Sequence, residues 1–288
     1  SFVLVLVNTA VVGLLIALFV FSRSRSSSGA NVSSALRAER SARQAATWPR
    51  YSVTKVSSIS HNTKVLRFAL PSSDATLNIP PGKHVMLRAR VDGELVVRPY
   101  TPTTPPGQRG YFELVVKMYK LGKMSRYVHG LKAGDEVEVK GPVGRITYRR
   151  NAFRTALLVG AGSGLTPLLQ LVRHAIDDPD DTTRMVLIYQ NREERDILLR
   201  EELERLAARN PDQVQLHLVL SRPSEGWTDA DPSSHHAGYV DTALLEAVCD
   251  QLSSQDTGAF LCGPGGFNDA VLEAMGKLGV EKDRTFVF

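Results

Sequence analysis

The pattern of apolar residues changes near residue 150, and no other feature of the sequence limits the fold as strongly. Between residues 51 and 150, short runs rich in valine, leucine and aromatic residues are separated by proline, glycine and aspartate. The runs cover residues 51–60, 64–70, 83–91, 111–119 and 135–144. Such runs predict consecutive antiparallel strands that close a small barrel.

After residue 150, apolar strands alternate with amphipathic helices. This rhythm predicts an open parallel sheet with helices on both faces, which is a doubly wound α/β domain. We therefore predict a β plus α/β protein, with a barrel domain over residues 51–150 and an α/β domain over residues 151–288.

The first 22 residues form a separate apolar segment. Residues 2–21 carry no charged side chain. A helix of about 20 such residues is long enough to cross the roughly 30 Å hydrocarbon core of a bilayer. We predict a transmembrane helix, as an anchor, over residues 1–22. A cleaved signal peptide is the competing interpretation, although its apolar region usually spans only about 7–15 residues.

Residues 23–50 are rich in serine and alanine and strongly basic, with six arginines against the single acid Glu39. We predict a linker that lies near anionic lipid headgroups. Positive charge beside a membrane helix favours the cytosolic side, so we expect the two domains to face the cytosol. The endoplasmic reticulum is the expected membrane, and the mitochondrial outer membrane is the alternative.

The net charge of +5 comes entirely from this linker, because residues 51–288 hold 29 basic and 29 acidic residues. The charge therefore gives no reason to expect a nucleic acid partner. A hydrophobic content of 43% and a charged content of 23% exclude a wholly disordered chain. Two cysteines, Cys249 and Cys262, are too few for a disulfide framework, and no metal site is predicted.

Two glycine-rich turns follow apolar strands in the α/β half. GAGSGLTP covers residues 160–167 and LCGPGGF covers residues 261–267. The first matches neither a P-loop nor the GxGxxG fingerprint, and each could be a plain strand-to-helix turn. Ligands bind beyond the carboxyl ends of parallel strands, so the two turns together predict one crevice. In the barrel half, RPYTPTT (98–104) and LGKMS (121–125) offer cations, an aromatic ring and free helix amides to a flat, phosphorylated ligand.

These motifs follow one another in the order and spacing of NADH-cytochrome b5 reductases, and residues 51–288 resemble that family. The segments that carry the resemblance are SHNTKVLRFALP, RPYTPTT, YFELVVKMY, GKMSRYV, LKAGDEVEVKGPVGRITY, GAGSGLTPLLQ, NREERDILLREEL, LCGPGGF and the terminal FVF. The resemblance implies FAD in the barrel, NADH on the α/β domain and cytochrome b5 as electron acceptor. It also implies hydride transfer from NADH to flavin N5, followed by two one-electron transfers to a haem protein. We expect a monomer.

The resemblance further implies the cofactor-binding residues. On the flavin side these are Arg98, Pro99, Tyr100, Thr101, Val115, Lys117, Lys123, Met124, Ser125, Thr166 and Phe288. On the nucleotide side they are Gly162, Ser163, Gly164, Cys262, Gly263 and Pro264. Thr101 and Cys262 are the catalytic candidates, Thr101 through a hydrogen bond at flavin N5 and Cys262 beside the nicotinamide. The candidate cations for docking an acidic haem protein are Lys83, Lys120, Lys123 and Lys132.

Two local features bear on the nucleotide. The family usually has CGPPPM where this chain has CGPGGF, so Gly265, Gly266 and Phe267 predict a looser turn and a bulkier side chain. At the end of the second α/β strand, the carboxylates of Glu193 and Glu194 predict NADH over NADPH, whereas Arg192 could accept a 2′-phosphate.

Two other functions stay open at this point. The chain could be the reductase portion of a multicentre enzyme such as nitrate reductase. It could also be a membrane-tethered binding module that keeps the flavoprotein fold without turnover.

Overall fold

The computed structural model describes residues 48–105, 107–249 and 255–288. The anchor predicted over residues 1–22 and nearly all of the predicted linker lie outside these residues. Within the described part of the chain, no helix combines the length and the apolar character needed to cross a membrane.

The first domain is a six-stranded antiparallel sheet in the order β4-β3-β6-β1-β2-β5. Its strands are β1 (Arg50–Ser60), β2 (Thr63–Ala69), β3 (His84–Val91), β4 (Glu94–Tyr100), β5 (Tyr111–Lys117) and β6 (Glu136–Val143). The sheet curls around one apolar core, and helix α3 (Lys123–Gly130) contributes Met124 and Val128 to that core. The predicted antiparallel domain is confirmed, and β4 is a strand that the apolar pattern does not predict.

The second domain is a six-stranded parallel sheet in the order β10-β9-β8-β7-β11-β12. Its strands are β7 (Thr155–Ala161), β8 (Arg184–Asn191), β9 (Val214–Leu220), β10 (His235–Ala237), β11 (Thr257–Cys262) and β12 (Thr285–Val287). The helices are α4 (Leu165–Asp177), α5 (Arg200–Arg209), α6 (Trp227–Ala230), α7 (Thr242–Val248) and α8 (Gly265–Lys277). Three short 3₁₀ turns cover Gly162–Gly164, Glu194–Asp196 and Lys282–Arg284.

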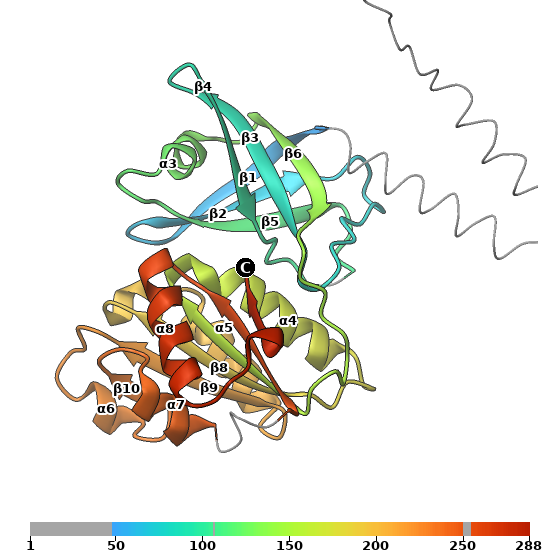
Figure 1. Ribbon diagram of the computed structural model, residues 1–288. Coiled ribbons are helices and arrows are strands. Elements are labelled where there is room, and N and C mark those ends of the chain that lie inside the picture. The colour runs from blue at the N-terminus through green and yellow to red at the C-terminus, as the bar shows by residue number, and fades with distance from the viewer. Residues whose placement is uncertain (1–47, 106, 250–254) are drawn as a thin grey trace, which may run out of the picture. The chain divides into compact units, whose positions relative to one another are not determined.

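Helices cover both faces of this parallel sheet, as the strand and helix rhythm predicts (Figure 1). Side chains alternate along β7, so Leu158 packs with α4 and α5 on one face, and Leu157 packs with α7 and α8 on the other. The strand order reverses between β7 and β11. This pair of strands is therefore the switch point where ligands bind in open α/β sheets.

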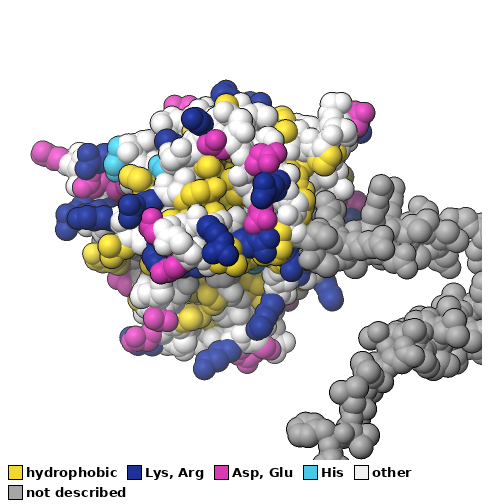
Figure 2. Space-filling view, turned by 90° about the horizontal axis from the view of Figure 1, so that it is seen from above, with side chains coloured by type: hydrophobic (Ala, Val, Ile, Leu, Met, Phe, Trp, Pro, Cys, Tyr) yellow, Lys and Arg dark blue, Asp and Glu magenta, His cyan; other side chains and the backbone are white. Residues whose placement is uncertain are grey.

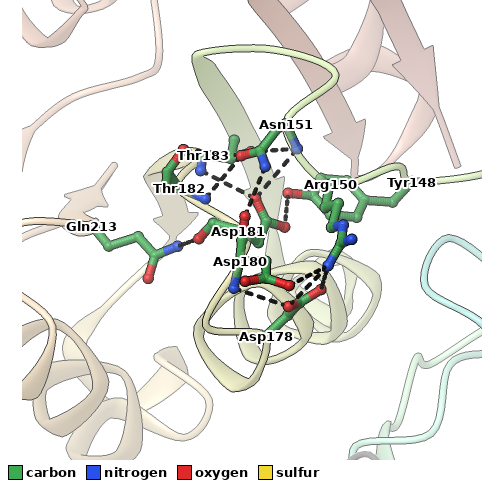
Figure 3. A network of polar contacts seen from close by, with 9 residues as sticks. All are labelled: Tyr148, Arg150, Asn151, Asp178, Asp180, Asp181, Thr182, Thr183 and Gln213. Carbon is green, nitrogen blue, oxygen red and sulfur yellow. Dashed lines mark hydrogen bonds and ion pairs between the residues drawn. The ribbon is translucent and has the colours of Figure 1, made fainter.

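Hydrogen bonds and ion pairs join residues 148–151, in the segment that connects the domains, to residues 178–183, in the loop before β8 (Figure 3). The buried carboxylate of Asp181 accepts hydrogen bonds from the Tyr148 hydroxyl at 2.7 Å and from the Asn151 and Thr183 amides at 3.4 and 3.1 Å. Burial raises the pKa of Tyr148, so its hydroxyl stays a donor. These bonds fix the connector onto the α/β domain.

Helix α4 also binds the barrel directly. The Gln170 side chain accepts a hydrogen bond from the Gly82 amide at 3.0 Å and donates one to the Lys83 carbonyl at 3.1 Å. Arg173 of the same helix donates to the Thr103 carbonyl and pairs with Glu202. These contacts set the position of the barrel over the carboxyl ends of β7 and β11.

Candidate functional site

A cavity of about 370 Å³ lies between the two domains, at the switch point of the parallel sheet. Residues 99–101 at the end of β4 and residues 115–117 at the end of β5 form its barrel wall. The turns after β7 and β11 and the terminal residue Phe288 form the opposite wall. We call this space the central cavity. Its volume is within the range of ligand-binding pockets, about 300–1,000 Å³.

The two glycine turns touch each other behind the central cavity. A Cβ atom at Gly164 would overlap the carbonyl oxygen of Cys262, so only glycine fits at this position. The hydroxyl of the buried Tyr189 donates a hydrogen bond to the Gly162 carbonyl at 2.8 Å, and this bond stabilises the first turn. At Gly162, where a Cβ would meet only the Tyr119 hydroxyl at 3.7 Å, the backbone of the first turn is open to a ligand.

Most of the predicted site residues meet at the central cavity. They are Pro99, Tyr100, Thr101, Val115, Lys117, Ser163, Gly164, Thr166, Cys262, Gly263, Pro264 and Phe288. Residues from segments up to 189 positions apart thus line one space, as the crevice prediction requires. Their individual contacts with cofactors stay predictions.

Tyr100, Thr101 and Phe288 are three side chains of the central cavity that bear on its chemistry. Burial raises the pKa of Tyr100 to about 12, so its phenol is neutral and can donate a hydrogen bond. The Thr101 side chain is buried, and its hydroxyl has no hydrogen-bond partner among the described residues. The Phe288 amide donates to the Leu261 carbonyl at 3.0 Å, which fixes the terminal ring beside β11.

Cys262 lies at the end of β11 with its side chain in the wall of the central cavity. Burial raises the pKa of its thiol to about 12. The thiol is therefore neutral at physiological pH and cannot act as a thiolate nucleophile there. Its place in the site is that of a small, apolar wall residue next to the nucleotide turn.

Five predicted residues do not line the central cavity. Arg98 is exposed and donates to the Val97 carbonyl at 2.8 Å, and Lys123 pairs with Glu94 at 2.5 Å. Met124 is packed in the barrel core. The Ser125 hydroxyl accepts from the Tyr119 amide and donates to the Gly122 carbonyl, so it shapes the loop before α3. Gly162 lies in the turn itself and borders a second cavity.

That second cavity, which we call the outer cavity, also has a volume of about 370 Å³ and lies over the ends of β8 and β9. It is lined by Lys117, Tyr119, Ala161, Gly162, Gln190, Asn191, Arg192, Ser221, Arg222, Tyr239, Pro264 and Phe267. Both cavities share Lys117, Tyr119, Ala161 and Pro264. Together they form one elongated site that extends from the flavin side to the edge of the parallel sheet.

Lys117 stands at the junction of the two cavities. Its ammonium group lies 3.0 Å from a carboxylate oxygen of Asp196, and both side chains are largely buried. Lys117 is therefore oriented by the α/β domain although it belongs to the barrel. A phosphorylated ligand that spans both cavities would pass this cation.

The carboxylates of Glu193 and Glu194 are not part of the outer cavity wall. Glu193 pairs with Arg195 at 2.8 Å, and Glu194 pairs with Arg200 at 3.0 Å. A hydrogen bond from Ser224 and the nearby Arg200 lower the pKa of Glu194. The carboxylates predicted to favour NADH by repelling a 2′-phosphate are therefore each paired with an arginine and do not line the outer cavity.

Tyr119 and His84 are site residues that the sequence does not single out. The Tyr119 hydroxyl lies 2.7 Å from the Ser163 hydroxyl and so connects the barrel loop to the glycine turn. His84 lines the central cavity, and burial together with Lys83 lowers the pKa of its ring. Tyr119 lies at the end of a predicted strand, where strand periodicity gives no sign of a cross-domain contact.

The described residues fit the two predicted cofactors. The central cavity offers the aromatic rings of Tyr100, Tyr119 and Phe288 and the hydroxyl of Thr101, which suit a flat ring system such as isoalloxazine. The first glycine turn is open at Gly162, where a Cβ would meet only the Tyr119 hydroxyl, at 3.7 Å, and the guanidinium groups of Arg192 and Arg222 line the outer cavity beside it. FAD would be held by the barrel wall, and NADH by the two turns and the ends of β8 and β9.

Comparisons with known proteins agree with this geometry. Residues 50–148 match the model of the oxidoreductase FAD-binding domain, and residues 158–273 match that of the oxidoreductase NAD-binding domain. The chain is 38% identical over 230 residues to NADH-cytochrome b5 reductase 1 of Dictyostelium discoideum, covering 80% of this chain and 78% of the relative. It is 39% identical over 231 residues to NADH-cytochrome b5 reductase 1 of Bos taurus, covering 72% and 73%.

Among solved structures, the chain is similar to the cytochrome b5 reductase domain of Ulva prolifera nitrate reductase. The TM-score is 0.78 at 34% sequence identity, and the match covers 85% of this chain and 98% of that domain. The curated relatives exceed 30% identity over most of both chains, and the two matched domains contain every residue that lines the central cavity except Phe288. The chain is therefore an FAD- and NAD-binding oxidoreductase and belongs to the NADH-cytochrome b5 reductase family.

Proposed function

We propose that this enzyme passes electrons from NADH through FAD to cytochrome b5. The observation that carries the proposal is the contact of the two glycine turns behind a cavity lined by both domains. When bound there, FAD supplies the ability to accept a hydride and to release electrons singly. The chain's own residues bind and orient the two cofactors and exclude water from the space between them.

Three side chains have distinct positioning roles in this proposal. Thr101 offers a buried hydroxyl that can hold a proton near the reacting edge of the flavin. Lys117, fixed by Asp196, balances phosphate charge where the two cavities meet. Phe288 covers the α/β side of the central cavity, next to the turn after β11. No acid and base pair is needed for this chemistry.

The proposed acceptor site is the exposed loop before α3. Of the candidate docking cations, Lys120 and Lys132 are exposed, and their ammonium groups have no hydrogen bond or ion pair with the described residues. Lys83 donates to Gly144 and Thr147, and Lys123 pairs with Glu94. Leu121, 92% exposed, follows Lys120 and offers an apolar contact. Basic and acidic side chains are interspersed on the face in Figure 2, so attraction to an acidic haem protein depends on such local groups.

The test is an anaerobic titration of the purified, yellow protein with NADH, followed by oxidised cytochrome b5. We expect the flavin absorbance to bleach and then to recover as the cytochrome is reduced, with a rate that falls as salt is added. A colourless protein, or a flavin that NADH does not bleach, would instead support the non-catalytic binding module. The variant Lys120→Glu should slow cytochrome reduction. Lys282→Glu is the control, because Lys282 is an exposed lysine in the 3₁₀ turn before β12 and lines neither cavity.

A second candidate is the reductase portion of a multicentre enzyme such as nitrate reductase. The similarity to the nitrate reductase domain favours it, since that domain is structurally alike at 34% identity. Bleaching by NADH without reduction of cytochrome b5 would support this candidate over the first.

We further propose that residues 1–22 anchor the protein in a membrane and that residues 23–50 form a basic linker on lipid headgroups. In this proposal the barrel (residues 51–150) and the α/β domain (residues 151–288) face the cytosol, and the protein is a monomer. The apolar run and the arginine-rich segment support this arrangement. The endoplasmic reticulum is the proposed membrane, and the mitochondrial outer membrane is the alternative. Imaging of a tagged chain, with and without residues 1–50, tests the location, and light scattering in detergent tests the monomer.

A further inference from the structure

Two arginines stand side by side at the edge of the outer cavity. The register of β8 and β9 pairs Asn191 with Leu220, and the pairing continues beyond the strands. The Ser221 amide donates to the Asn191 carbonyl at 3.1 Å, and the Arg222 amide donates to the Arg192 carbonyl at 2.8 Å. The backbone therefore presents both arginines at the same level, beyond the carboxyl ends of adjacent parallel strands.

Neither guanidinium group is paired with another side chain in the described part of the protein. Arg192 and Arg222 are both exposed, and neither side chain has a hydrogen bond or ion pair with a described residue. Both line the outer cavity. A pair of adjacent, unneutralised guanidinium groups in a cavity wall favours a bound anion.

No carboxylate opposes these two cations in the wall of the outer cavity. The acids nearest to Arg192 in the sequence, Glu193 and Glu194, pair with Arg195 and Arg200. Glu225, the acid nearest to Arg222, is exposed and does not line the cavity. The third cation of the wall, Lys117, is balanced by Asp196. The excess positive charge of the outer cavity is therefore concentrated at Arg192 and Arg222.

The position of this charge identifies the kind of anion. In dinucleotide-binding sheets, the adenosine ribose lies at the end of the strand that follows the glycine turn and its helix, which is β8 here. An arginine at that place accommodates a 2′-phosphate, whereas a carboxylate binds a free 2′-hydroxyl. We propose that Arg192 and Arg222 bind the 2′-phosphate of NADPH, so that the enzyme oxidises NADPH as well as NADH. This inference rests on the proposed function, since it extends the choice of nucleotide at the same site.

The same geometry allows NADH to remain a substrate. A nucleotide without the 2′-phosphate leaves both guanidinium groups exposed to water, and no buried charge loses its partner. The part-exposed hydroxyl of Ser221 in the cavity wall stays available to the ribose hydroxyl groups. The wall thus adds a favourable contact for NADPH without excluding NADH.

The test compares two probes that differ by the 2′-phosphate, adenosine 2′,5′-bisphosphate and adenosine 5′-monophosphate, in calorimetric titrations of the FAD-loaded protein. We expect the bisphosphate to bind at least about tenfold more tightly, since charge-assisted bonds to phosphate are strong. The double variant Arg192→Ala/Arg222→Ala should lose this preference. Arg184→Ala is the matched control, because Arg184 is an exposed arginine at the opposite end of β8 and should leave the preference unchanged.

Turnover provides a second measurement. We expect kcat/KM for NADPH to lie within about tenfold of kcat/KM for NADH in the unaltered enzyme. In the double variant, the ratio of kcat/KM for NADPH to kcat/KM for NADH should fall by at least about tenfold. Equal affinity for the two probes, or a preference that survives in the double variant, would overturn the inference. If NADH bleaches the flavin and NADPH does not, the inference is wrong and the proposed function stands. If neither nucleotide bleaches the flavin, the proposed function is wrong, and the two probes still decide whether the 2′-phosphate is bound.

Discussion

The α-carbon of Gly164 rests against the carbonyl oxygen of Cys262, so the turns after β7 and β11 are in direct backbone contact. Any Cβ at position 164 would overlap that oxygen. The contact fixes the separation of the two turns that enclose the switch point of the parallel sheet.

Gly164→Ala should therefore force the two turns apart. We expect a loss of about 1–3 kcal/mol in the free energy of unfolding, as for other overpacked sites, together with weaker nucleotide binding. Thermal unfolding and NADH titration measure the two effects. Gly265→Ala is the control, because no atom lies within 4 Å of a Cβ there and alanine should stabilise the start of α8 slightly. Unchanged stability of Gly164→Ala would contradict the contact.

Thr101→Val tests the buried hydroxyl of the central cavity. The substitution keeps the shape of the side chain and removes its hydroxyl, which is the only hydrogen-bond donor of that side chain. Flavin reduction by NADH should therefore slow by about 3–10-fold. Thr101→Ser keeps the hydroxyl and should retain most of the rate. Stopped-flow measurement of flavin bleaching gives the rates, and equal rates for the valine and serine variants would rule out the role.

Cys262 should react slowly with alkylating reagents. Its pKa is raised to about 12 by burial, so at pH 8 the thiolate fraction is at least about a hundredfold lower than in an ordinary cysteine. Mass spectrometry after timed exposure to iodoacetamide measures the rate at this residue. Alkylation at the rate of a free thiol would show that the side chain is not buried in the cavity wall.

Asp181→Ala should destabilise the junction between the domains. The substitution leaves the buried Tyr148 hydroxyl and the Thr183 amide without the acceptor that Asp181 provides, whereas the Asn151 amide keeps the Thr183 hydroxyl, and we expect a loss of about 2–3 kcal/mol in the free energy of unfolding. Asp180→Ala is the control, since it removes only an exposed ion pair with Arg150 and should cost less than about 1 kcal/mol. Chemical denaturation compares the two, and similar losses would argue against the network.

Stability should fall in mild acid because of His217. Burial and the neighbouring His236 lower its pKa to about 4 from 6.5, and Arg184 also lowers it while Asp231 opposes the shift. Between these two pH values the unfolded chain binds a proton that the folded protein does not, so the free energy of unfolding decreases as the pH falls through this window, by up to about 3 kcal/mol. Above pH 6.5 the group has no such effect. His217→Gln should flatten the pH dependence measured by denaturation between pH 6.5 and 4, and an unaltered slope would refute the assignment.

The change of apolar pattern near residue 150 predicts both sheets because each sheet is built from strongly apolar strands. The apolar pattern does not predict strand β4, because β4 is an edge strand and only Val96 of its seven residues is buried. The three-residue strands β10 and β12 are likewise too short to give a pattern. Helix α8 begins at Gly265, two residues before the apolar periodicity starts, because Pro264 and the glycines carry no periodic signal.

The candidate site is predictable where backbone geometry demands particular residues, as at Gly164 and Pro264. It is less predictable where side-chain pairing decides which way a group turns. Glu193 and Glu194 lie at the expected position along the chain. Their carboxylates pair with Arg195 and Arg200 and do not line the outer cavity. Arg222 comes from the next strand, and only the register of β8 and β9 shows that it stands beside Arg192.

The contacts of α4 with the barrel have a consequence for protein engineering. Gln170 and Arg173 bind the amide of Gly82 and the carbonyl groups of Lys83 and Thr103, all of which are main-chain atoms. A barrel from another member of the family would present the same atoms whatever side chains it carried. Chimeras that join a foreign flavin domain to this α/β domain should therefore dock in the native orientation, provided that the loops around residues 82 and 103 keep their backbone course.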